Sequence, residues 1–237
     1  MPLAKNDAHG ENRNGWAFVE SAPLFAGVSL EDSRRISAAA RLKRFARGEM
    51  LFLEGDKVEQ VLMLTSGFVK ITQLGPRGLE VILRLGAAGD VLDTASLFST
   101  GSHRATAQVI RGCGALVWDA GIFKTLIDPI PVLHQNLIRF THGQLRELEE
   151  RFRELATERV APRVARQLIR LQEQSGSPQV DVEISLSREG IAQMTGTTLY
   201  TVSRLLSTWE EHGLINSRRE SVIIRDVWAL RRVFEEN

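Results

Sequence analysis

Five side chains near the start of one predicted helix have the chemistry to contact DNA bases. They are Thr198, Leu199, Tyr200, Ser203 and Arg204, in the segment TLYTVSR. A guanidinium can donate two hydrogen bonds to O6 and N7 of a guanine, and a serine hydroxyl can bond either kind of base edge. A helix with only a structural role does not need this exposed set. The segment therefore favours DNA recognition over an ordinary αα-hairpin in a protein core, which is the alternative.

The residues around Gly196 predict the elements that would position this set. Glycine suits a tight helix-to-helix turn because it adopts positive φ at little cost. Apolar residues recur at helical spacing on both sides of it: Ile191, Ala192, Met194, Val202, Leu205, Leu206 and Trp209. The stretch 187–211 is thus predicted to be a helix-turn-helix, whose second helix can enter the major groove.

A basic β-hairpin is predicted directly after that stretch. Two β-prone runs, 214–216 and 222–225, flank the segment SRRE, and Asp226 is expected to cap a last helix over 227–234. Hairpin and helix-turn-helix together predict a winged helix-turn-helix domain over 161–237. Phosphate contacts position a protein on DNA without specifying sequence. The candidates for such contacts are Ser187, Thr197, Thr198, Arg218 and Arg219.

Earlier in the chain, short β-prone runs alternate with glycines. The runs are 50–53, 61–64, 68–72, 79–85, 107–110 and 115–118. Several short strands separated by turn residues at intervals of about ten positions predict a sandwich or a barrel-like roll. The segment 75–78 is expected to be a hairpin tip. Before the roll, Ser29 is expected to cap a short helix.

One long, highly charged helix is predicted after Pro131. Its apolar positions alternate in spacings of three and four, as in a coiled coil: Ile138, Thr141, Leu145, Leu148, Phe152 and Leu155. The same helix of a second chain is the simplest partner for so narrow a stripe, which predicts a homodimer. The alternative is packing on the chain's own roll, where Leu133 and Leu137 are expected to face. Pro162 is predicted to break the helix, and a new one is expected over 163–174.

Composition sets the broad class. The chain has 237 residues, 43% hydrophobic and 25% charged, which is ordinary for a globular protein. No apolar run reaches the roughly 18 residues of a membrane span, and the polar start lacks a signal peptide's apolar region. Residues 1–20 are therefore expected to be a flexible tail, and the protein to be cytoplasmic. Net charge is only +1, so any DNA-binding surface must be local.

Motifs for catalysis are not found. The single cysteine, Cys113, excludes an internal disulfide and an iron–sulfur cluster held by four cysteines of one chain. There is no His-x-His pair for a cupin-type metal site, no P-loop and no dinucleotide-binding fingerprint. We therefore expect neither an enzyme nor a metal site.

In this order the parts resemble the CRP/FNR family of bacterial transcription regulators, over roughly residues 24–235. The similarity is strongest in ISLSREGIAQMTGTTLYTVSRLLSTWEEHGLI, in EGD at 54–56 and in SGFVKI at 66–71. It implies an α+β fold: an N-terminal β-roll similar to a cyclic-nucleotide-binding jelly roll (21–128), a long dimerisation helix (129–160) and the winged helix-turn-helix. It also implies a homodimer that binds a palindromic double-stranded site, is coupled allosterically to its roll, and contacts RNA polymerase.

Two departures from the family concern the recognition helix. Ser203 and Arg204 match the FNR-like pattern. Leu199 stands where the family often has arginine, and Tyr200 where it commonly has glutamate. A glutamate accepts from cytosine N4, which tyrosine cannot do in the same way. The resemblance thus predicts a half-site different from the family's common one.

Further departures concern the effector. Members that bind cyclic AMP resemble one another in a Gly-Glu pair and a downstream Arg-Ser pair; here Asp93-Thr94 and Ala105-Thr106 align with them. Arg104 is one residue away and, on a strand, would point to the other face. Cyclic AMP is therefore disfavoured. The candidate effector residues are Asp93, Thr94, Arg104 and Thr106.

Haem stays open as a cofactor. Pro2 matches the N-terminal proline of the family's CO-sensing branch, but Asp93 and Ala95 stand where that branch has Cys and His. His9, His103, His134 and His142 are possible ligands, with surface or packing roles favoured. The segment ATAQ at 105–108 is similar to the nitric-oxide-responsive (DNR-like) branch, which supplies the leading hypothesis for the effector.

Two alternatives to this regulator are kept: a module that acts by protein contact with a degenerate helix-turn-helix, and a cyclic-AMP-binding regulator. A basic rim around Arg204, Arg218 and Arg219 would distinguish DNA binding from the first. The sequence names neither the effector nor the operator, and it does not distinguish an activator from a repressor.

Overall fold

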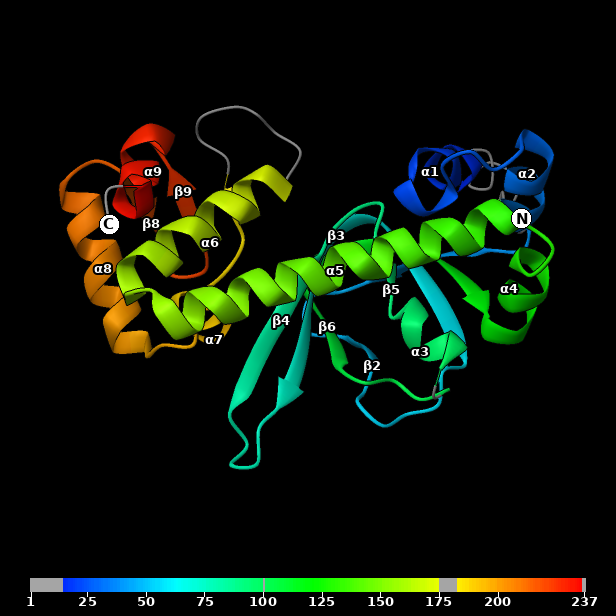
Figure 1. The fold of residues 1–237 in the computed structure, drawn as a ribbon, viewed down its shortest axis with the longest axis horizontal. Coiled ribbons are helices and arrows are strands. Elements are labelled where there is room, and N and C mark those ends of the chain that lie inside the picture. The colour runs from blue at the N-terminus through cyan, green and yellow to red at the C-terminus, as the bar shows by residue number, and fades with distance from the viewer. Residues whose placement is uncertain (1–14, 100, 175–182, 236–237) are drawn as a thin grey trace, which may run out of the picture. The chain divides into compact units, whose positions relative to one another are not determined.

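The computed structural model describes residues 15–99, 101–174 and 183–235, and the chain forms two compact units. Unit 1 is made of described residues within Met1–Val69 and Gly86–Leu145; unit 2 of those within Lys70–Leu85 and Arg146–Asn237. The predicted architecture is confirmed: a β-sheet domain, a long helix and a winged helix-turn-helix follow one another along the chain (Figure 1). Residues 70–85, although part of the predicted roll, belong to unit 2.

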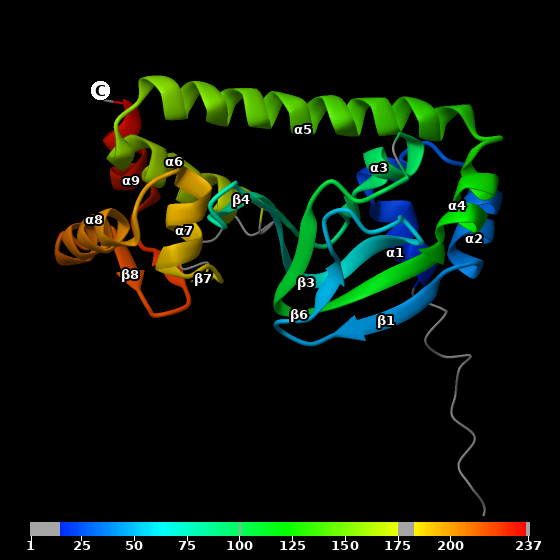
Figure 2. The same ribbon diagram turned by 90° about the horizontal axis from the view of Figure 1, so that it is seen from below.

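Unit 1 contains most of the roll. Its helices are α1 (Gly15–Ser21), the 3-10 turn η2 (Pro23–Phe25), α2 (Leu30–Ala38), α3 (Thr94–Phe98) and α4 (Ala120–Ile127). Its strands are β1 (Arg41–Phe45), β2 (Met50–Phe52), β5 (Val91–Leu92), β6 (Thr106–Asp119) and the first part of β3 (Gln60–Leu74). The sheet order is β1-β6-β3-β4, where β4 is Glu80–Gly86 (Figure 2). Strand β2 pairs with β6, and β5 with β3.

The core of unit 1 joins the sheet to the helices around it. Trp118 and Phe123 are fully buried at its centre, and the Trp118 indole N–H donates to the carbonyl of Ile36 in α2 at 2.7 Å. A buried indole needs such a partner, because an unpaired donor in an apolar interior costs free energy. The predicted Ser29 cap is confirmed, since its Oγ accepts from the Asp32 amide at 3.0 Å.

The predicted flexible tail over 1–20 requires a correction. Gly15–Ser21 is the helix α1, and Val19 is fully buried in the core of unit 1. A helix of seven residues is not stable by itself in water, and the burial of the Val19 side chain in the core stabilises it here. Residues 1–14 lie outside the described part of the chain.

The strands are longer than predicted. β3 joins the expected runs 61–64 and 68–72, and β6 joins 107–110 and 115–118. Gly67, expected to mark a turn, lies inside β3 at φ +83°, where an added Cβ would lie 2.5 Å from the Cα of Cys113 in β6. This glycine therefore permits a close approach of two strands, and the chain does not turn there.

Gly67→Ala is expected to destabilise the roll more than Gly48→Ala. Both sites have positive φ, which costs an alanine about 1–2 kcal/mol. Only the Gly67 site is also crowded by backbone atoms, which adds about 1–3 kcal/mol of overpacking, while nothing lies within 4 Å of a Cβ at Gly48. Urea unfolding of the two variants measures the difference; equal losses of stability would contradict the crowding at Gly67.

Helix α5 (Pro131–Thr157) has residues in both units and confirms the predicted long helix. Its first turns are fixed to unit 1 by Asn136, whose Nδ2 donates to the carbonyls of Leu24 (2.9 Å) and Ala26 (2.8 Å). Leu133 is buried, as predicted. Within the described ranges, no helix combines the length and the apolarity that crossing a membrane requires.

Unit 2 contains the winged helix-turn-helix. Its elements are α6 (Val160–Gln174), β7 (Glu183–Ile184), α7 (Arg188–Thr195), α8 (Leu199–Glu211), β8 (Ile215–Ser217), β9 (Val222–Ile224) and α9 (Val227–Glu235). The small sheet has the order β7-β9-β8, and α6 packs beside α9 (Figure 1). Val164, Leu168, Ile191, Val202 and Leu206 are fully buried in this unit.

Pro162 does not separate the two helices as predicted. It lies in the first turn of α6, which begins at Val160. Proline is tolerated there because the first amides of a helix have no intrahelical acceptor. Strand β7 is described as Glu183–Ile184, and residues 175–182 before it lie outside the described part of the chain.

Candidate nucleic-acid interface and effector residues

The turn of the helix-turn-helix is fixed by local caps. Ser187 is the N-cap of α7, and its Oγ accepts from the Gly190 amide at 3.1 Å. Gly196 is the C-cap of α7 and lies in the left-handed region at φ 59° and ψ 44°. Thr198 is the N-cap of α8, and its Oγ1 accepts from the Thr201 amide at 3.1 Å. The predicted helix-turn-helix is thus confirmed.

Helix α8 has one buried face and one exposed face. Val202, Leu206 and Trp209 are buried in unit 2. On the other side Tyr200 is 74% exposed, Leu199 and Arg204 are also exposed, and Ser203 is half-buried. The predicted base-contacting residues therefore lie on the face of α8 that the rest of the chain leaves open.

The residues predicted to contact phosphates have mixed roles. Ser187 and Thr198 use their hydroxyl oxygens as acceptors in the two caps, which leaves Ser187 an O–H that can donate to a phosphate. Thr197 is half-buried in the turn, and Arg218 and Arg219 are exposed at the wing. Arg218 also lies 3.7 Å from the Glu183 carboxylate, an ion pair open to water and therefore weak.

Arg188 joins this surface, although the sequence analysis missed it. It is the first residue of α7, and its Nε and Nη2 donate to Ser217 Oγ of β8 at 3.3 and 3.1 Å. This contact places a guanidinium between the first helix and the wing. The available sequence signal was an arginine directly after the N-cap serine.

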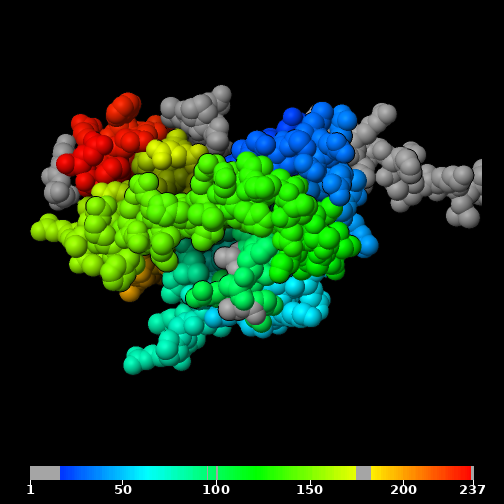
Figure 3. All heavy atoms as spheres, turned by 45° about the vertical axis from the view of Figure 1, so that its right-hand side comes forward, coloured from blue at the N-terminus to red at the C-terminus, as the bar shows by residue number. Residues whose placement is uncertain are grey.

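The coiled-coil stripe of α5 is exposed in this single chain. Ile138 and Phe152 are each 71% exposed, and Leu145, Leu148 and Leu155 between 44% and 52%. Thr141 is exposed as well. Figure 3 shows one side of α5, in green to yellow-green, uncovered by other parts of the chain. An exposed apolar row of this length is typical of a protein–protein interface.

The four candidate effector residues have different surroundings. Asp93 begins α3 at φ 49°; its Oδ2 lies 2.7 Å from Nδ1 of His103, and its Oδ1 accepts from Ser96 Oγ at 2.7 Å. Thr94 is buried beside it, whereas Arg104 is exposed. Thr106 Oγ1 accepts from the Glu54 amide at 3.1 Å.

His103 is the member of this cluster that sequence reasoning did not connect with Asp93. It is 6% exposed, and its ring is stacked on that of Phe52, with centroids 3.9 Å apart and planes 7° from parallel. This geometry gives it a packing role, the role favoured in the sequence analysis over haem ligation. No periodicity links these two residues, because a loop separates them.

These residues do not fit a cyclic phosphate. The resemblance places the ribose-accepting glutamate at Thr94 and the arginine for the phosphate at Ala105, and neither side chain carries such a group. Beside Thr94, the carboxylate of Asp93 pairs with His103, and a negative phosphate next to that carboxylate would be repelled. That cyclic AMP is disfavoured stays a prediction.

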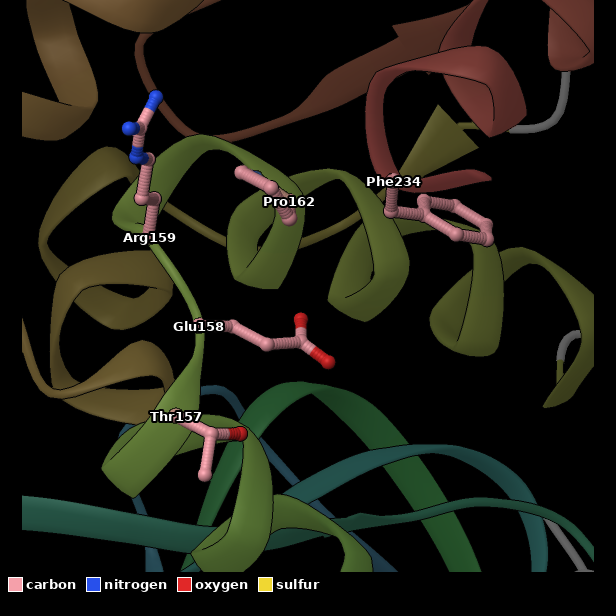
Figure 4. A pocket seen from close by; sticks show the side chains of 5 residues that line it. All are labelled: Thr157, Glu158, Arg159, Pro162 and Phe234. Carbon is pink, nitrogen blue, oxygen red and sulfur yellow. The ribbon is translucent and has the colours of Figure 1, made fainter. Parts of the chain in front are cut away.

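A pocket of about 310 Å³ lies elsewhere, in unit 2 (Figure 4). It is lined by Thr157, Glu158, Arg159, Pro162 and Phe234, which come from the junction of α5 and α6 and from α9. The carboxylate of Glu158, which lines this pocket, already pairs with Arg166 at 2.5 Å. None of the predicted site residues lines it.

Neither metal binding nor thiol chemistry is supported at the predicted sites. Within the ranges that the structure describes, no three His, Cys, Asp or Glu side chains cluster as a metal ion would need. Cys113 is buried, and burial, together with the charge of Glu49, raises the pKa of its thiol. The thiolate needed for nucleophilic chemistry is therefore disfavoured.

Comparison with known proteins gives two domain matches. Residues 162–233 match the Crp-like helix-turn-helix domain, and residues 42–129 match the cyclic nucleotide-binding domain. The sequence is 28% identical over 214 residues to the CRP-like cAMP-activated global transcriptional regulator of Mycobacterium tuberculosis, covering 89% of this chain and 96% of that protein. It is also 28% identical over 238 residues to the nitrogen fixation regulation protein FixK of Azorhizobium caulinodans, covering 95% and 92%.

The fold is similar to that of solved regulators. The structure of FixK2 from Bradyrhizobium japonicum superposes with a TM-score of 0.71 at 25% identity, covering 82% of this chain and 96% of that one. These relatives are transcription regulators, and none of them is an enzyme by name.

Proposed function

This chain belongs to the CRP/FNR family of transcription regulators, and we propose that it acts as a homodimer on a palindromic DNA site. It is a DNA-binding regulator with a cyclic-nucleotide-binding-like domain and a helix-turn-helix domain. The observation that supports the proposed mode of binding is the open face of α8. There Tyr200 and Arg204 are exposed on a helix whose other face is buried and whose start is capped by Thr198.

Base recognition is assigned to the first two turns of α8. Arg204 is proposed to bond guanine bidentately, with Ser203 beside it. Leu199 is suited to apolar contact with a thymine methyl, and Tyr200 presents a hydroxyl at the same end of the helix. Ser187, Arg188, Arg218 and Arg219 are proposed to contact phosphates and so fix the position of α8 in the groove.

Dimerisation is assigned to the exposed stripe of α5. A two-fold axis along this stripe would bring identical residues of the two chains together, as an isologous interface requires. The two recognition helices would then contact half-sites about one turn of DNA apart. Since the winged helix-turn-helix domain begins with α6, which follows α5 directly, the dimer contact sets the spacing of those half-sites.

The roll is proposed to sense an effector other than cyclic AMP. Effector binding would alter DNA affinity only if the effector binds one dimer geometry better than the other. The similarity to the nitric-oxide-responsive branch stays a prediction. We also propose that the protein contacts RNA polymerase, that it is located in the cytoplasm and that it is not an enzyme.

Selection of duplexes from a randomised library by the wild-type protein tests this function. We expect an enriched site with two-fold symmetry and half-site centres about 10 base pairs apart. Because of Leu199 and Tyr200, the half-site should lack the cytosine contact that a glutamate would make. Enrichment of an asymmetric site would contradict the dimer, and no enrichment at all would contradict base recognition by α8.

A further inference from the structure

The guanidinium of Arg151 lies in a cage of backbone carbonyls in unit 2. Arg151 is in α5 and is only 8% exposed. Its Nη1 donates to the carbonyl of Leu83, and its Nη2 donates to those of Ile82 (3.1 Å) and Met194 (2.8 Å). Burial lowers the pKa of this group, although the neighbouring Glu147 opposes the shift. One side chain of α5 therefore bonds strand β4 and helix α7 at the same time.

The bond to Met194 reaches the carboxyl end of α7, beside the turn. Carbonyls in the last turn of a helix lack partners within it and carry the negative end of its dipole. Here the next carbonyl, that of Thr195, accepts from Nη2 of Arg163 in α6 at 3.2 Å. Two cations from two other helices thus cap the end of α7, immediately before Gly196.

Contacts at two more points locate α7 between β4 and α5. A Cβ added at Gly190 would lie 3.6 Å from Cδ1 of Ile82, so β4 also approaches the middle of α7. A Cβ at Gly196 would lie 2.6 Å from Cδ2 of Leu155, one helical turn beyond Arg151 in α5. The turn of the helix-turn-helix therefore sits directly against α5, and α7 against β4.

The same segment of α5 is held to α6 by ion pairs, made by a residue one helical turn after Arg151. Glu154 is 4% exposed; its carboxylate accepts from Arg170 and lies 3.4 Å from Arg166. Arg166 also pairs with Glu158 at 2.5 Å. These bonds fix the segment of α5 that contains Arg151, so the guanidinium cannot move without β4 or α7 moving too.

We propose that Arg151 is a positioning residue for DNA recognition: it joins strand β4 to α7 and so sets the orientation of α8. This rests on the proposed function. Strand β4 is hydrogen-bonded in the sheet to β3, which begins at Gln60 in the roll. A shift of these strands on effector binding thereby reaches the recognition helix through Arg151, in addition to any motion of α5. A buried charge costs desolvation that apolar packing would avoid, which fits a role in positioning better than one in stability.

The test uses the full-length chain with three substitutions. Arg151→Met keeps the length of the side chain but removes every donor. Arg151→Lys keeps the charge but loses the planar fork that bonds two segments at once. Arg153→Met is the matched control, because Arg153 is exposed two residues further along the same helix. Fluorescence anisotropy measures affinity for the duplex selected by the wild-type protein and for a scrambled duplex, and amide hydrogen exchange measures local order.

We expect Arg151→Met to weaken binding of the selected duplex about tenfold or more, since the buried carbonyls of Met194 in α7 and of Ile82 and Leu83 in β4 would lose this donor. Binding of the scrambled duplex should change less than about threefold, because it depends on phosphate contacts alone. Arg151→Lys should also lower the preference for the selected duplex over the scrambled one, but by a smaller factor. Arg153→Met should leave that preference unchanged. In Arg151→Met, amide hydrogen exchange should become faster at residues 82–84 and at residues 194–198, while the amides of α9 stay protected from exchange.

Three outcomes would overturn the inference. In the first, Arg151→Met keeps the wild-type preference and exchange rates. In the second, Arg151→Met lowers the affinity for both duplexes by the same factor, and amide hydrogen exchange becomes faster throughout unit 2. General destabilisation of that unit would produce this result. In the third, Arg151→Lys behaves as wild type, so that charge alone matters. If Arg151→Met does not fold, Arg151→Lys decides by the same readouts. If the wild-type protein prefers no duplex, the proposed function fails, while the exchange data still test the link between β4 and α7.

Discussion

Arg204→Ala is expected to abolish the preference of the protein for its selected duplex and to leave most of its affinity for scrambled DNA. Arg204 is exposed in the second turn of α8, on the face opposite the buried Val202 and Leu206. A bidentate contact of arginine with guanine discriminates against a wrong base by about 1–3 kcal/mol, and a dimer makes the contact twice. Two such contacts amount to about 2–6 kcal/mol, so the expected loss of specificity is about 30-fold to 2 × 10⁴-fold.

Arg219→Ala is the matched control for that variant. Arg219 is exposed at the wing, and its proposed contact is with a phosphate, so its loss should weaken both duplexes alike and lower the salt dependence of binding. Anisotropy titrations at several salt concentrations separate the two effects. If Arg204→Ala lowered both affinities equally, as Arg219→Ala should, then Arg204 would be a phosphate contact and another residue of α8 would recognise the bases.

The elements that could be predicted from the sequence are those defined by local patterns. The helix-turn-helix was found because Gly196 suits a tight turn and apolar residues recur at helical spacing on both sides of it, two signals that act within a few residues. The wing was found from two β-prone runs and a polar turn. Helix α5 was found because its apolar spacing persists over the whole length between Pro131 and Thr157.

Features that depend on distant contacts were missed. Strand β1 exposes most of its side chains and forms by pairing with β6, from Arg41 opposite Val117 to Phe45 opposite Cys113. Gly67 was interpreted as a turn because no local pattern shows that another strand crosses it. The association of residues 70–85 with unit 2 depends on contacts more than 60 positions away in sequence, such as that between Leu83 and Arg151.

The same reason limits prediction of the sites. The exposed face of α8 follows from helical periodicity, so its candidate residues could be chosen before the structure was known. The partner of Asp93 could not, because His103 lies across a loop and its pairing follows from how the roll closes. Arg151 appeared to be one of many surface charges on α5, and only the carbonyls around it distinguish it from the exposed Arg153.

Glutamate at both Leu148 and Phe152 is expected to convert the dimer into a monomer. These side chains are 52% and 71% exposed in the single chain, and in a two-fold dimer four of them would be buried at the seam. Each large apolar side chain contributes about 1.5–3 kcal/mol on burial, and the carboxylates that replace them would have to lose water or repel one another. Size-exclusion chromatography with light scattering measures the mass across concentrations, and Arg153→Glu is the control outside the stripe.

The DNA affinity of that monomer tests how dimerisation serves recognition. Each chain keeps an intact α8, so it should still bind a single half-site, but with about half as many phosphate contacts and a correspondingly smaller salt slope. Binding to the full palindrome should fall to that level, because the second half-site no longer gains from the first. If the variant stays dimeric, contacts outside the stripe must hold the two chains together. If it is monomeric yet binds the palindrome as wild type does, then contacts at the DNA-binding domains, rather than α5, hold the two recognition helices together.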